Sequence, residues 1–167
     1  MKQLFSDIKT KKIMSSLDKG ILDYLPKILV SDQTASTNDD AKKYLLEQSS
    51  ALSVHLSEQQ IAGKGRNGKK WISPKGKNIY LSLGWKSALQ YSQLDGLSLS
   101  VGTVLATVLN RYTKNDINIK WPNDLVISQK KISGILIETI DIDGTVGIII
   151  GIGINVHMSK EDGKDID

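Results

Sequence analysis

The segment Gly63–Trp71 restricts the folds open to this chain more than any other stretch. It places three glycines and four cations in eight residues and ends on a tryptophan. Glycine lets the backbone approach a ligand closely, and clustered Lys and Arg side chains attract an anion. The indole adds a flat apolar surface. Together these features favour a ligand that joins a polyanion to a flat ring, as a nucleotide does.

Two nucleotide-binding folds are excluded by what surrounds these glycines. Gly63–Lys69 matches G-x-x-x-x-G-K, but the Ser or Thr that a P-loop needs next is Lys70. The same glycines spell G-x-G-x-x-G, which should open a helix and precede an acidic residue by about 20 positions. A turn and the alternating strand Asn78–Trp85 follow instead. The segment is therefore predicted to be a phosphate-seeking loop between two strands, with a mobile basic surface hairpin as the alternative.

Composition narrows the class of protein. With 167 residues, 40% of them hydrophobic, the chain can form one domain with a substantial core. It has no cysteine and only two histidines, His55 and His157, so thiolate chemistry, a zinc site and a histidine triad are disfavoured. No apolar signal core precedes Asp7, and the longest apolar run, Val146–Val156, is about half of a membrane span. We expect a cytoplasmic protein without membrane contact.

Hydrophobic periodicity predicts an α+β fold, in which a mixed β-sheet is packed with helices. The polar residues 1–26 are set apart as an N-terminal extension that is partly helical, and 27–167 form the domain. Apolar residues at helical spacing predict helices over Asn38–Gln48 and Gln93–Tyr112. Alternation and short apolar runs predict strands at Lys27–Ser31, Ser53–Ser57, Asn78–Trp85, Asp116–Trp121, Leu125–Ser128, Ile132–Ile140 and Thr145–Val156, with turns at Gln129-Lys130 and Asp143-Gly144.

Three further segments carry groups suited to ligand contact. Lys120 alternates with Ile119 and Trp121, so it is predicted to point away from the apolar side of its strand. A lysine at a strand end can neutralise charge that develops on a carboxylate or phosphoryl group, although a solvated surface lysine is the ordinary interpretation. Ser36-Thr37-Asn38 is either a helix cap or a polar ligand surface. Gly151–Asn155 is either a tight sheet crossing or a close backbone wall.

In this order and spacing, the segments resemble the catalytic domain of biotin protein ligase, also called biotin–[acetyl-CoA-carboxylase] ligase. The resemblance runs from about Leu29 to Val156 and includes Lys131–Leu136. Its most specific parts are the basic loop, usually G-R-G-R-x-G-R-x-W in the family, and Lys120-Trp121-Pro122-Asn123-Asp124. The resemblance implies the biotin/lipoate ligase fold, which is similar to that of class II synthetases.

The reaction that the resemblance implies has two steps. Biotin and MgATP form biotinyl-5′-adenylate, and the acyl group then passes to a lysine of a biotin carrier domain. The implied partner is a biotin-dependent carboxylase such as acetyl-CoA carboxylase. Chemistry of this kind needs positioning and charge stabilisation rather than a protein nucleophile.

The resemblance also implies roles for individual residues. Arg66 and Lys120 would stabilise the reacting carboxylate and α-phosphate, and in similar proteins the loop becomes ordered over bound biotin. Biotin would be held by Ser36, Thr37, Asn38, Gln60, Gly63, Lys64, Gly65, Lys120, Gly134, Gly151 and Gly153. The nucleotide would be held by Arg66, Asn67, Lys69, Trp71, Lys120 and Asn155. ATP and biotin are then substrates, Mg²⁺ is expected with ATP, and no residue is assigned as a metal ligand.

The chain departs from the family pattern in two respects. Lys64 and Lys69 stand where the family usually has Arg, which keeps the charge but loses the bidentate planar fork. Family members usually continue past Gly151–Asn155 into further helices and a small barrel, and repressor members begin with a winged helix. We therefore expect a catalytic domain without these parts that does not act as a repressor. A form that binds biotin or its adenylate without efficient transfer is one alternative.

Other functions stay open beside this one. A lipoate or octanoate ligase or transferase shares the fold but normally lacks the loop in this form. A nucleic-acid binder would use the net charge of +4 and the basic residues around the loop. Aromatic residues, however, make up only 5% of the chain and mostly occupy core positions, so we expect no specific nucleic-acid partner. Assembly as a homodimer is left open.

Overall fold

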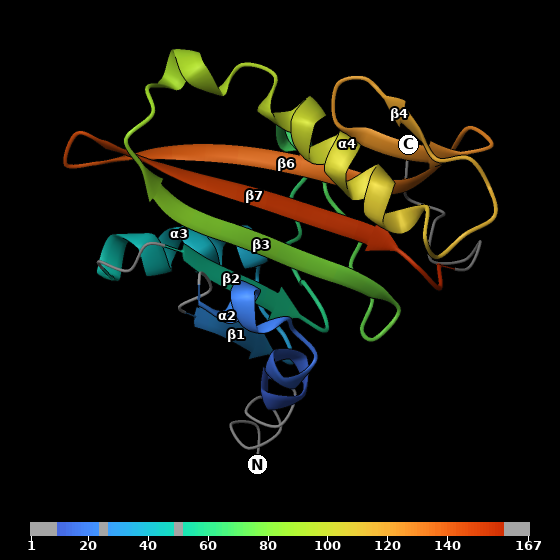
Figure 1. The fold of residues 1–167 in the computed structure, drawn as a ribbon, viewed down its shortest axis with the longest axis horizontal. Helices are drawn as coiled ribbons and strands as arrows, with labels where there is room; N and C mark the ends of the chain where they lie inside the picture. Colours follow the sequence, from blue (N-terminus) through green and yellow to red (C-terminus); the bar gives the residue numbers. More distant parts are fainter. Residues whose placement is uncertain (1–9, 24–26, 49–51, 159–167) are drawn as a thin grey trace.

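A seven-stranded sheet organises the molecule (Figure 1). The structure, a computed structural model, describes residues 10–23, 27–48 and 52–158. The strands are β1 (Lys27–Ser31), β2 (Leu52–Ser57), β3 (Asn78–Ser87), β4 (Asn118–Lys120), β5 (Asp124–Ile127), β6 (Lys130–Ile142) and β7 (Thr145–Asn155). Their order across the sheet is β1-β2-β3-β7-β6-β5-β4, with β1 and β2 parallel and the other neighbours antiparallel. The predicted α+β class with a mixed sheet is confirmed.

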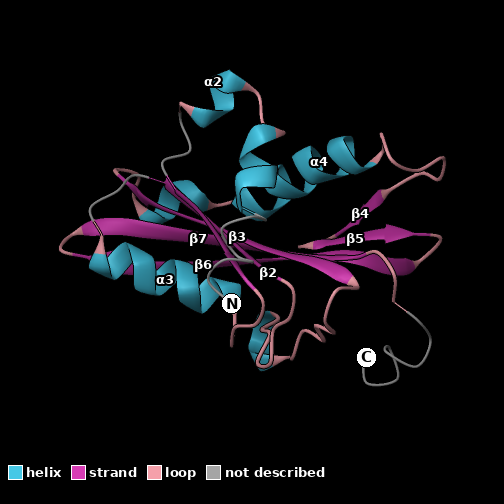
Figure 2. Cartoon of the chain, turned by 90° about the horizontal axis from the view of Figure 1, so that it is seen from below, coloured by secondary structure: helices cyan, strands magenta, loops and turns pink. Residues whose placement is uncertain are grey.

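Two helices cover opposite faces of this sheet (Figure 2). α3 (Thr37–Glu47) packs on β2, β3, β6 and β7, whereas α4 (Leu97–Leu109) packs on β4, β5 and β6. α3 lies close to β3 because Gly84 has no side chain. A Cβ at that position would lie only 3.3 Å from Ala41 Cβ and 3.4 Å from Leu45 Cδ1. Ala41 and Leu45 are fully buried and lie one helical turn apart. This contact anchors the helix whose first turn carries the polar segment Ser36-Thr37-Asn38.

Alternation along β7 places Gly151 and Gly153 on the face opposite to Ile148, Ile150 and Ile152, while Ile149 packs with Ala41 and Leu45 on the α3 side. Ile148, Ile150 and Ile152 belong to the core cluster beneath α4. Gly151 and Gly153 therefore face the α3 side. The sheet is thus apolar and filled on one face, and free of side chains at these positions on the other.

The helix predicted over Gln93–Tyr112 is wrong at both ends, since α4 ends at Leu109 and Tyr112 is exposed beyond it. A short 3₁₀ turn, η2 (Tyr91–Leu94), comes first, and α4 starts only at Leu97. Gly96 stands between them with φ +80°, in the left-handed region that glycine adopts at no steric cost. Leu94 keeps the apolar spacing across this break, so periodicity alone suggested one helix.

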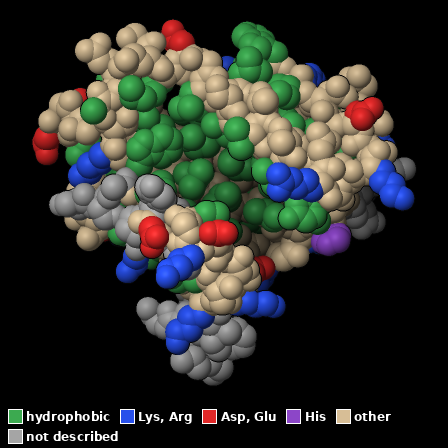
Figure 3. Space-filling view, in the orientation of Figure 1, with side chains coloured by type: hydrophobic (Ala, Val, Ile, Leu, Met, Phe, Trp, Pro, Cys, Tyr) green, Lys and Arg blue, Asp and Glu red, His purple; other side chains and the backbone are tan. Residues whose placement is uncertain are grey.

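α4 carries no charged residue and leaves part of its apolar surface uncovered. Taken by length and composition alone, Tyr91–Leu109 is the one segment in the described part of the chain that could cross a membrane. Its buried residues, Gly102 and Ala106, pack onto the sheet. Val104 on the outer side is 65% exposed, and Figure 3 shows apolar side chains gathered around the helix on this face.

The hairpins that flank β6 follow their turn residues. Asp143 and Gly144 have φ of 52° and 79°, as a two-residue hairpin turn between antiparallel strands requires, and this turn was predicted. The turn before β6 lies at Ser128-Gln129, one residue earlier than predicted, and both residues also have positive φ. The division of the chain at residue 26 stays a prediction because residues 24–26 lie outside the described residues.

Trp121 does not continue the apolar side of its strand, and that prediction is wrong. β4 ends at Lys120, and Trp121 begins the turn into β5 with 80% of its surface exposed. Alternation decides the face of a side chain only while the strand lasts. Lys120 is exposed, as predicted, and pairs with Asp124 across the hairpin.

Candidate ligand-binding site

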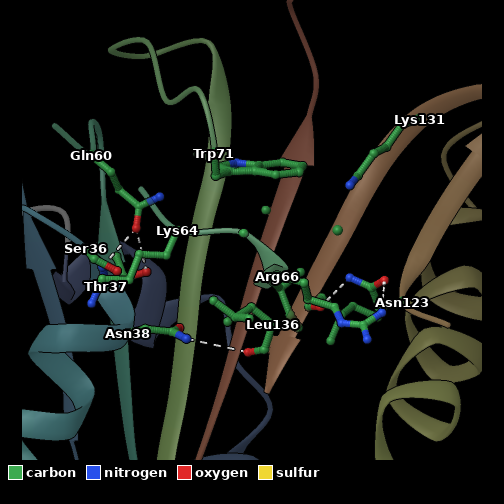
Figure 4. Close-up of a pocket in the computed structure, with 16 residues that line it drawn as sticks. Ser36, Thr37, Asn38, Gln60, Lys64, Arg66, Trp71, Asn123, Lys131 and Leu136 are labelled. Atoms are coloured by element: carbon green, nitrogen blue, oxygen red, sulfur yellow. Dashed lines mark hydrogen bonds between the residues drawn. The ribbon is translucent and has the colours of Figure 1, made fainter. Parts of the chain in front are cut away.

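A pocket lies on the α3 face of the sheet, where β6 and β7 carry glycines (Figure 4). Gly134 is paired with Gly153, and Leu136 with Gly151, so these residues share one face of the sheet. The pocket is lined by Ser36, Thr37, Asn38, Gln60, Lys64, Gly65, Arg66, Trp71, Asn123, Lys131, Gly134, Ile135, Leu136, Gly151, Ile152 and Gly153. Its floor is therefore sheet backbone, and its walls are the start of α3, the basic loop and the β4–β5 connection.

Hydrogen bonds hold the polar end of the pocket in place. Gln60 Oε1 accepts from the backbone N–H of Thr37 at 2.9 Å and lies 3.1 Å from the Thr37 hydroxyl oxygen. Gln60 Nε2 donates to Ser73 Oγ at 3.0 Å, which fixes the orientation of the amide. Behind Thr37, Ser82 Oγ lies 2.7 Å from Thr37 Oγ1 and 2.6 Å from Asn38 Oδ1. Polar groups tied together in this way can recognise a small polar group of a ligand.

Ser36 has the position of a helix cap but not its hydrogen bond. It precedes α3 directly, yet its side chain caps no backbone N–H of the helix. The residue is 2% exposed and lines the pocket. The geometry therefore leaves its hydroxyl available to the pocket, and its contact with a ligand stays a prediction.

The basic loop is tied to both sides of the pocket. On the α3 side, Lys64 Nζ forms an ion pair with Asp39 Oδ1 at 2.5 Å, and this hydrogen bond raises the pKa of Lys64. On the other side, Arg66 Nη1 donates to Asn123 Oδ1 at 3.2 Å. The loop thus spans the pocket from α3 to the β4–β5 connection, as Figure 4 shows for Lys64 and Arg66.

The shape of the loop follows from its glycines and Asn67. A 3₁₀ turn, η1 (Arg66–Gly68), forms its tip, where Asn67 and Gly68 have φ of 56° and 75°. Asn and Gly adopt this left-handed region more readily than other residues. At the base of the loop, the Trp71 N–H donates to Gly63 O at 2.9 Å. The prediction of a loop between two strands is confirmed, since β2 precedes it and β3 follows.

Trp71 lies flat over the glycine floor. A Cβ on Gly153 would come within 2.5 Å of Trp71 Nε1, and one on Gly134 within 2.8 Å of Trp71 Cζ3, so both positions need glycine. Lys131 Nζ lies 5.2 Å from the centroid of the ring, within the range of a cation–π contact. Trp71 Nε1 is buried and donates to no acceptor in the described structure. Because a buried donor without an acceptor is costly, this N–H suits an acceptor on a bound ligand.

Lys131 is a pocket residue that the sequence analysis did not assign. Simple alternation would place it with Ser133 on the α4 side of the sheet. The register between β5 and β6 shifts, however, because Leu125 pairs with Ser133 whereas Val126 pairs with Lys131. The extra residue forms a β-bulge and turns Lys131 to the face of Gly134. No short sequence pattern announces such a shift.

Lys120 lies on the pocket face but outside the pocket wall. One row of paired residues crosses the sheet from Lys120 through Asp124 and Gly134 to Gly153. Lys120 is two strands from Gly134, which corresponds to about 10 Å. Asp124 between them forms an ion pair with Lys131 at 2.8 Å, without the geometry of a hydrogen bond. Lys131, rather than Lys120, is therefore the lysine next to the floor.

The pocket is small, and a larger cavity adjoins it beneath the loop. Their volumes are about 50 Å³ and about 820 Å³. Gln60, Lys64, Arg66, Trp71 and Leu136 line both. Sites for small ligands commonly measure roughly 300–1,000 Å³. The pocket alone is therefore too small for a ligand of that size, whereas the adjoining cavity falls within this range.

The structure brings most of the predicted site residues together. Eleven of them line the pocket: Ser36, Thr37, Asn38, Gln60, Lys64, Gly65, Arg66, Trp71, Gly134, Gly151 and Gly153. Gly63, Asn67 and Lys69 line the adjoining cavity. Lys120 and Asn155 line neither space, and Asn155 Nδ2 donates to Lys131 O at 3.4 Å. The contacts of all these residues with a ligand stay predictions.

Comparison with known proteins gives one family. The model of the Biotin/lipoate A/B protein ligase family matches residues 30–155. The bifunctional ligase/repressor BirA of Escherichia coli is 37% identical over 157 residues, which cover 92% of this chain and 46% of that protein. The biotin--[acetyl-CoA-carboxylase] ligase of Paracoccus denitrificans is 31% identical, over 78% of this chain and 55% of that protein. The chain thus spans about half the length of the curated relatives it matches.

Solved structures agree with the sequence comparison. Biotin protein ligase from Leishmania major, in complex with biotinyl-5-AMP, has a TM-score of 0.68 and 29% identity over 80% of this chain and 59% of that one. The enzyme from Aquifex aeolicus, in complex with biotin and ATP, has a TM-score of 0.65 and 29% identity over 81% of this chain and 56% of that one. The catalytic-domain fold expected from the resemblance is confirmed.

Proposed function

The chain belongs to the Biotin/lipoate A/B protein ligase family, and from this premise we propose that it activates biotin with ATP and transfers it to a protein lysine. The acceptor is the carrier domain of a biotin-dependent carboxylase, of the acetyl-CoA carboxylase type, in the cytoplasm. One observation carries the proposal. A hydrogen-bonded polar end, a glycine floor and a cationic end occur in one pocket beneath a basic loop.

The two ends of the pocket suit the two ends of biotin. Thr37 and Gln60 form the polar end, where the ureido ring would exchange hydrogen bonds. Arg66 and Lys131 lie towards the other end, where they would face the carboxylate. The bicyclic ring would lie between these ends along the glycine floor, once Trp71, which covers Gly153, has moved. This orientation places the reacting carboxylate beside the cations.

The nucleotide would bind where the loop and Trp71 meet. The indole offers a face for stacking, and its buried Nε1 has no acceptor in the described structure. Arg66 and Lys69 come from the loop and can approach the phosphates when it closes. Lys120 and Lys131 share the pocket face of the sheet and can stabilise charge on the α-phosphate.

The chemistry then needs no nucleophile from the protein. A carboxylate oxygen of biotin attacks the α-phosphorus of ATP, and pyrophosphate leaves. The amine of the carrier lysine next attacks the acyl carbon of the adenylate, loses a proton, and AMP leaves. The residues of the pocket position these groups and stabilise the charge that develops on the phosphate and acyl oxygens.

Magnesium would enter with ATP. Among residues 10–23, 27–48 and 52–158, no group of three or more His, Asp or Glu side chains is arranged to hold a metal ion. Mg²⁺ commonly binds through substrate phosphates and few protein ligands. We therefore assign it to the phosphates rather than to a protein cluster.

The test is a mass-spectrometric search for acyl-adenylate after the protein is mixed with MgATP and, separately, biotin, lipoate or octanoate. Biotinyl-adenylate alone is expected. An adenylate of lipoate or octanoate instead would assign the chain to another branch of the family. Where no adenylate forms, binding of pre-made biotinyl-adenylate distinguishes a binding domain from a wrong assignment of the site.

A further inference from the structure

A chain of hydrogen bonds runs from the pocket to the carboxylate of Glu138, which lines the adjoining cavity rather than the pocket itself. It begins at Thr37 Oγ1, continues through Ser82 Oγ to the amide of Asn38, and ends where Asn38 Nδ2 donates to Glu138 Oε2 at 2.6 Å. Glu138 follows Leu136 by two residues on β6 and therefore lies on the same face. Ser82 is fully buried and Asn38 is 3% exposed, so their protons must go to protein partners.

The number of available protons determines which atom donates in each of these hydrogen bonds. A carboxylate can only accept, so Asn38 turns its NH₂ group to Glu138. Asn38 Oδ1 then faces Ser82 Oγ at 2.6 Å and must accept the one proton that Ser82 has. The contact of 2.7 Å between Ser82 Oγ and Thr37 Oγ1 still needs a proton, and only Thr37 can supply it.

The other hydrogen-bond partner of Thr37, Gln60, does not need the proton of the Thr37 hydroxyl. Gln60 Oε1 lies 3.1 Å from the Thr37 hydroxyl, but it already accepts the backbone N–H of the same residue at 2.9 Å. The Thr37 hydroxyl therefore directs its proton into the sheet, towards Ser82. Its lone pairs remain for whatever group enters the pocket.

We propose that Glu138 is a positioning residue that makes Thr37 an acceptor for an N–H group of the ligand. It does so through Asn38 and Ser82, and touches no reacting atom itself. The inference rests on the proposed function and deepens it, because an acceptor at Thr37 would distinguish biotin from other carboxylic acids. The ureido ring of biotin carries N–H groups far from its carboxylate, whereas lipoate and octanoate carry none.

Loss of the acceptor at position 138 leaves only the longer bond from Asn38 Nδ2 to Leu136 O, at 3.5 Å, to hold this orientation. The Asn38 amide can then turn over, so that Nδ2 donates to Ser82 Oγ in the place where Oδ1 accepted from it. Ser82 would donate to Thr37, and Thr37 to Gln60. The Thr37 hydroxyl would then use one lone pair on Ser82 and present less acceptor capacity to the pocket.

The experiment compares Glu138→Gln, which keeps an oxygen acceptor, with Glu138→Met, which has similar length and none. Asp143→Asn, in the turn between β6 and β7, is the control for loss of one charge on the same hairpin. Asn tolerates the positive φ of that position. Biotin and lipoate binding are measured by calorimetry, and kcat and KM for biotin are measured by pyrophosphate release.

Glu138→Met is expected to weaken biotin binding about tenfold and to raise the KM for biotin by the same factor, as for one lost hydrogen bond. Its kcat at saturating biotin and its lipoate binding should stay within about twofold of wild type. Glu138→Gln and Asp143→Asn should bind biotin like wild type.

Three results would overturn the inference. Equal biotin binding by Glu138→Met and wild type would show that the acceptor does not matter. Equal losses in the Gln and Met variants would assign the effect to charge or folding rather than to the acceptor. Absence of biotin binding by the wild-type protein would refute the proposed function itself, and the inference with it.

Discussion

Lys131 Nζ and Asp124 Oδ1 lie 2.8 Å apart at the edge of the glycine floor. The β-bulge in the β5–β6 pairing brings this cation to the pocket face, and Asp124 holds it beside the Trp71 ring. An anionic ligand in the pocket can therefore compete with Asp124 for the lysine. The positive charge of Lys131 therefore lies next to the proposed position of the reacting carboxylate, and Asp124 keeps this charge paired.

Lys131→Ala should lower the rate of biotinyl-adenylate formation about 100-fold or more, as expected when a charge-stabilising group is removed. The fold should persist, because the Lys131 side chain is exposed. Pyrophosphate release measures the rate. Lys130→Ala, at the neighbouring exposed position outside the pocket, is the control. A Lys131→Ala rate within threefold of the control would contradict the role.

Lys120→Ala tests the lysine that the sequence analysis assigned. We expect adenylate formation to be lost, since Lys120 shares the sheet row of Asp124 and Gly134. The melting temperature should stay unchanged because the residue is exposed on β4, away from the apolar core. Wild-type activity of this variant would leave Lys131 as the lysine that acts on the carboxylate and phosphate.

Asp39→Asn should loosen the basic loop by removing the ion pair with Lys64. Both side chains are more than 40% exposed, so we expect little change in global stability. Limited trypsin digestion should cut the loop about two- to threefold faster, a range typical of weak surface pairs. Glu47→Gln removes the exposed pair with Lys43 and is the control. Faster cleavage in that variant as well would show that the effect is not local.

Gly153→Ala should displace the Trp71 indole, because the new Cβ would lie 2.5 Å from its Nε1. We expect the KM for ATP to rise about tenfold or more, as for loss of a stacking or hydrogen-bonding partner. A red shift of the Trp71 fluorescence, measured in a Trp85→Phe, Trp121→Phe background, reports the displacement. An unshifted spectrum would mean that the sheet yields instead of the indole.

His55 should make the protein less stable in mild acid. Burial lowers its pKa to about 4, and it is 6% exposed beneath Tyr44. Because the unfolded chain protonates near pH 6.5, the stabilising contribution is complete above that pH and is lost as the pH falls towards 4. The loss amounts to about 3 kcal/mol.

Urea unfolding of wild type and His55→Gln at pH 7.5, 6, 5 and 4.5 measures this contribution. The raised pKa of Asp40 acts in the opposite direction in both proteins, so the difference between them isolates His55. Parallel pH profiles for the two proteins would contradict the prediction.

Local sequence was sufficient to predict the sheet, the helices and the loop. Alternation predicted β7, and the φ preferences of Asp143 and Gly144 predicted its hairpin. Because the residues that follow Gly63–Trp71 fit neither nucleotide-binding motif, this segment was predicted to be a loop between two strands. These features depend on neighbours a few residues away, so they are visible in the sequence. The helix before Leu97 was wrong because the left-handed Gly96 left the apolar spacing intact.

Tertiary structure decided which groups meet. A shift of one residue in the β5–β6 register turned Lys131 into the pocket, and pairing between strands sets that register. The order of the strands left Lys120 on β4, two strands from the glycine floor. The bond from Asn38 to Glu138 joins residues 100 positions apart, so no local pattern contains it. The sequence alone determined the elements and the chemical groups at hand, whereas strand pairing determined their distances and the directions of their hydrogen bonds.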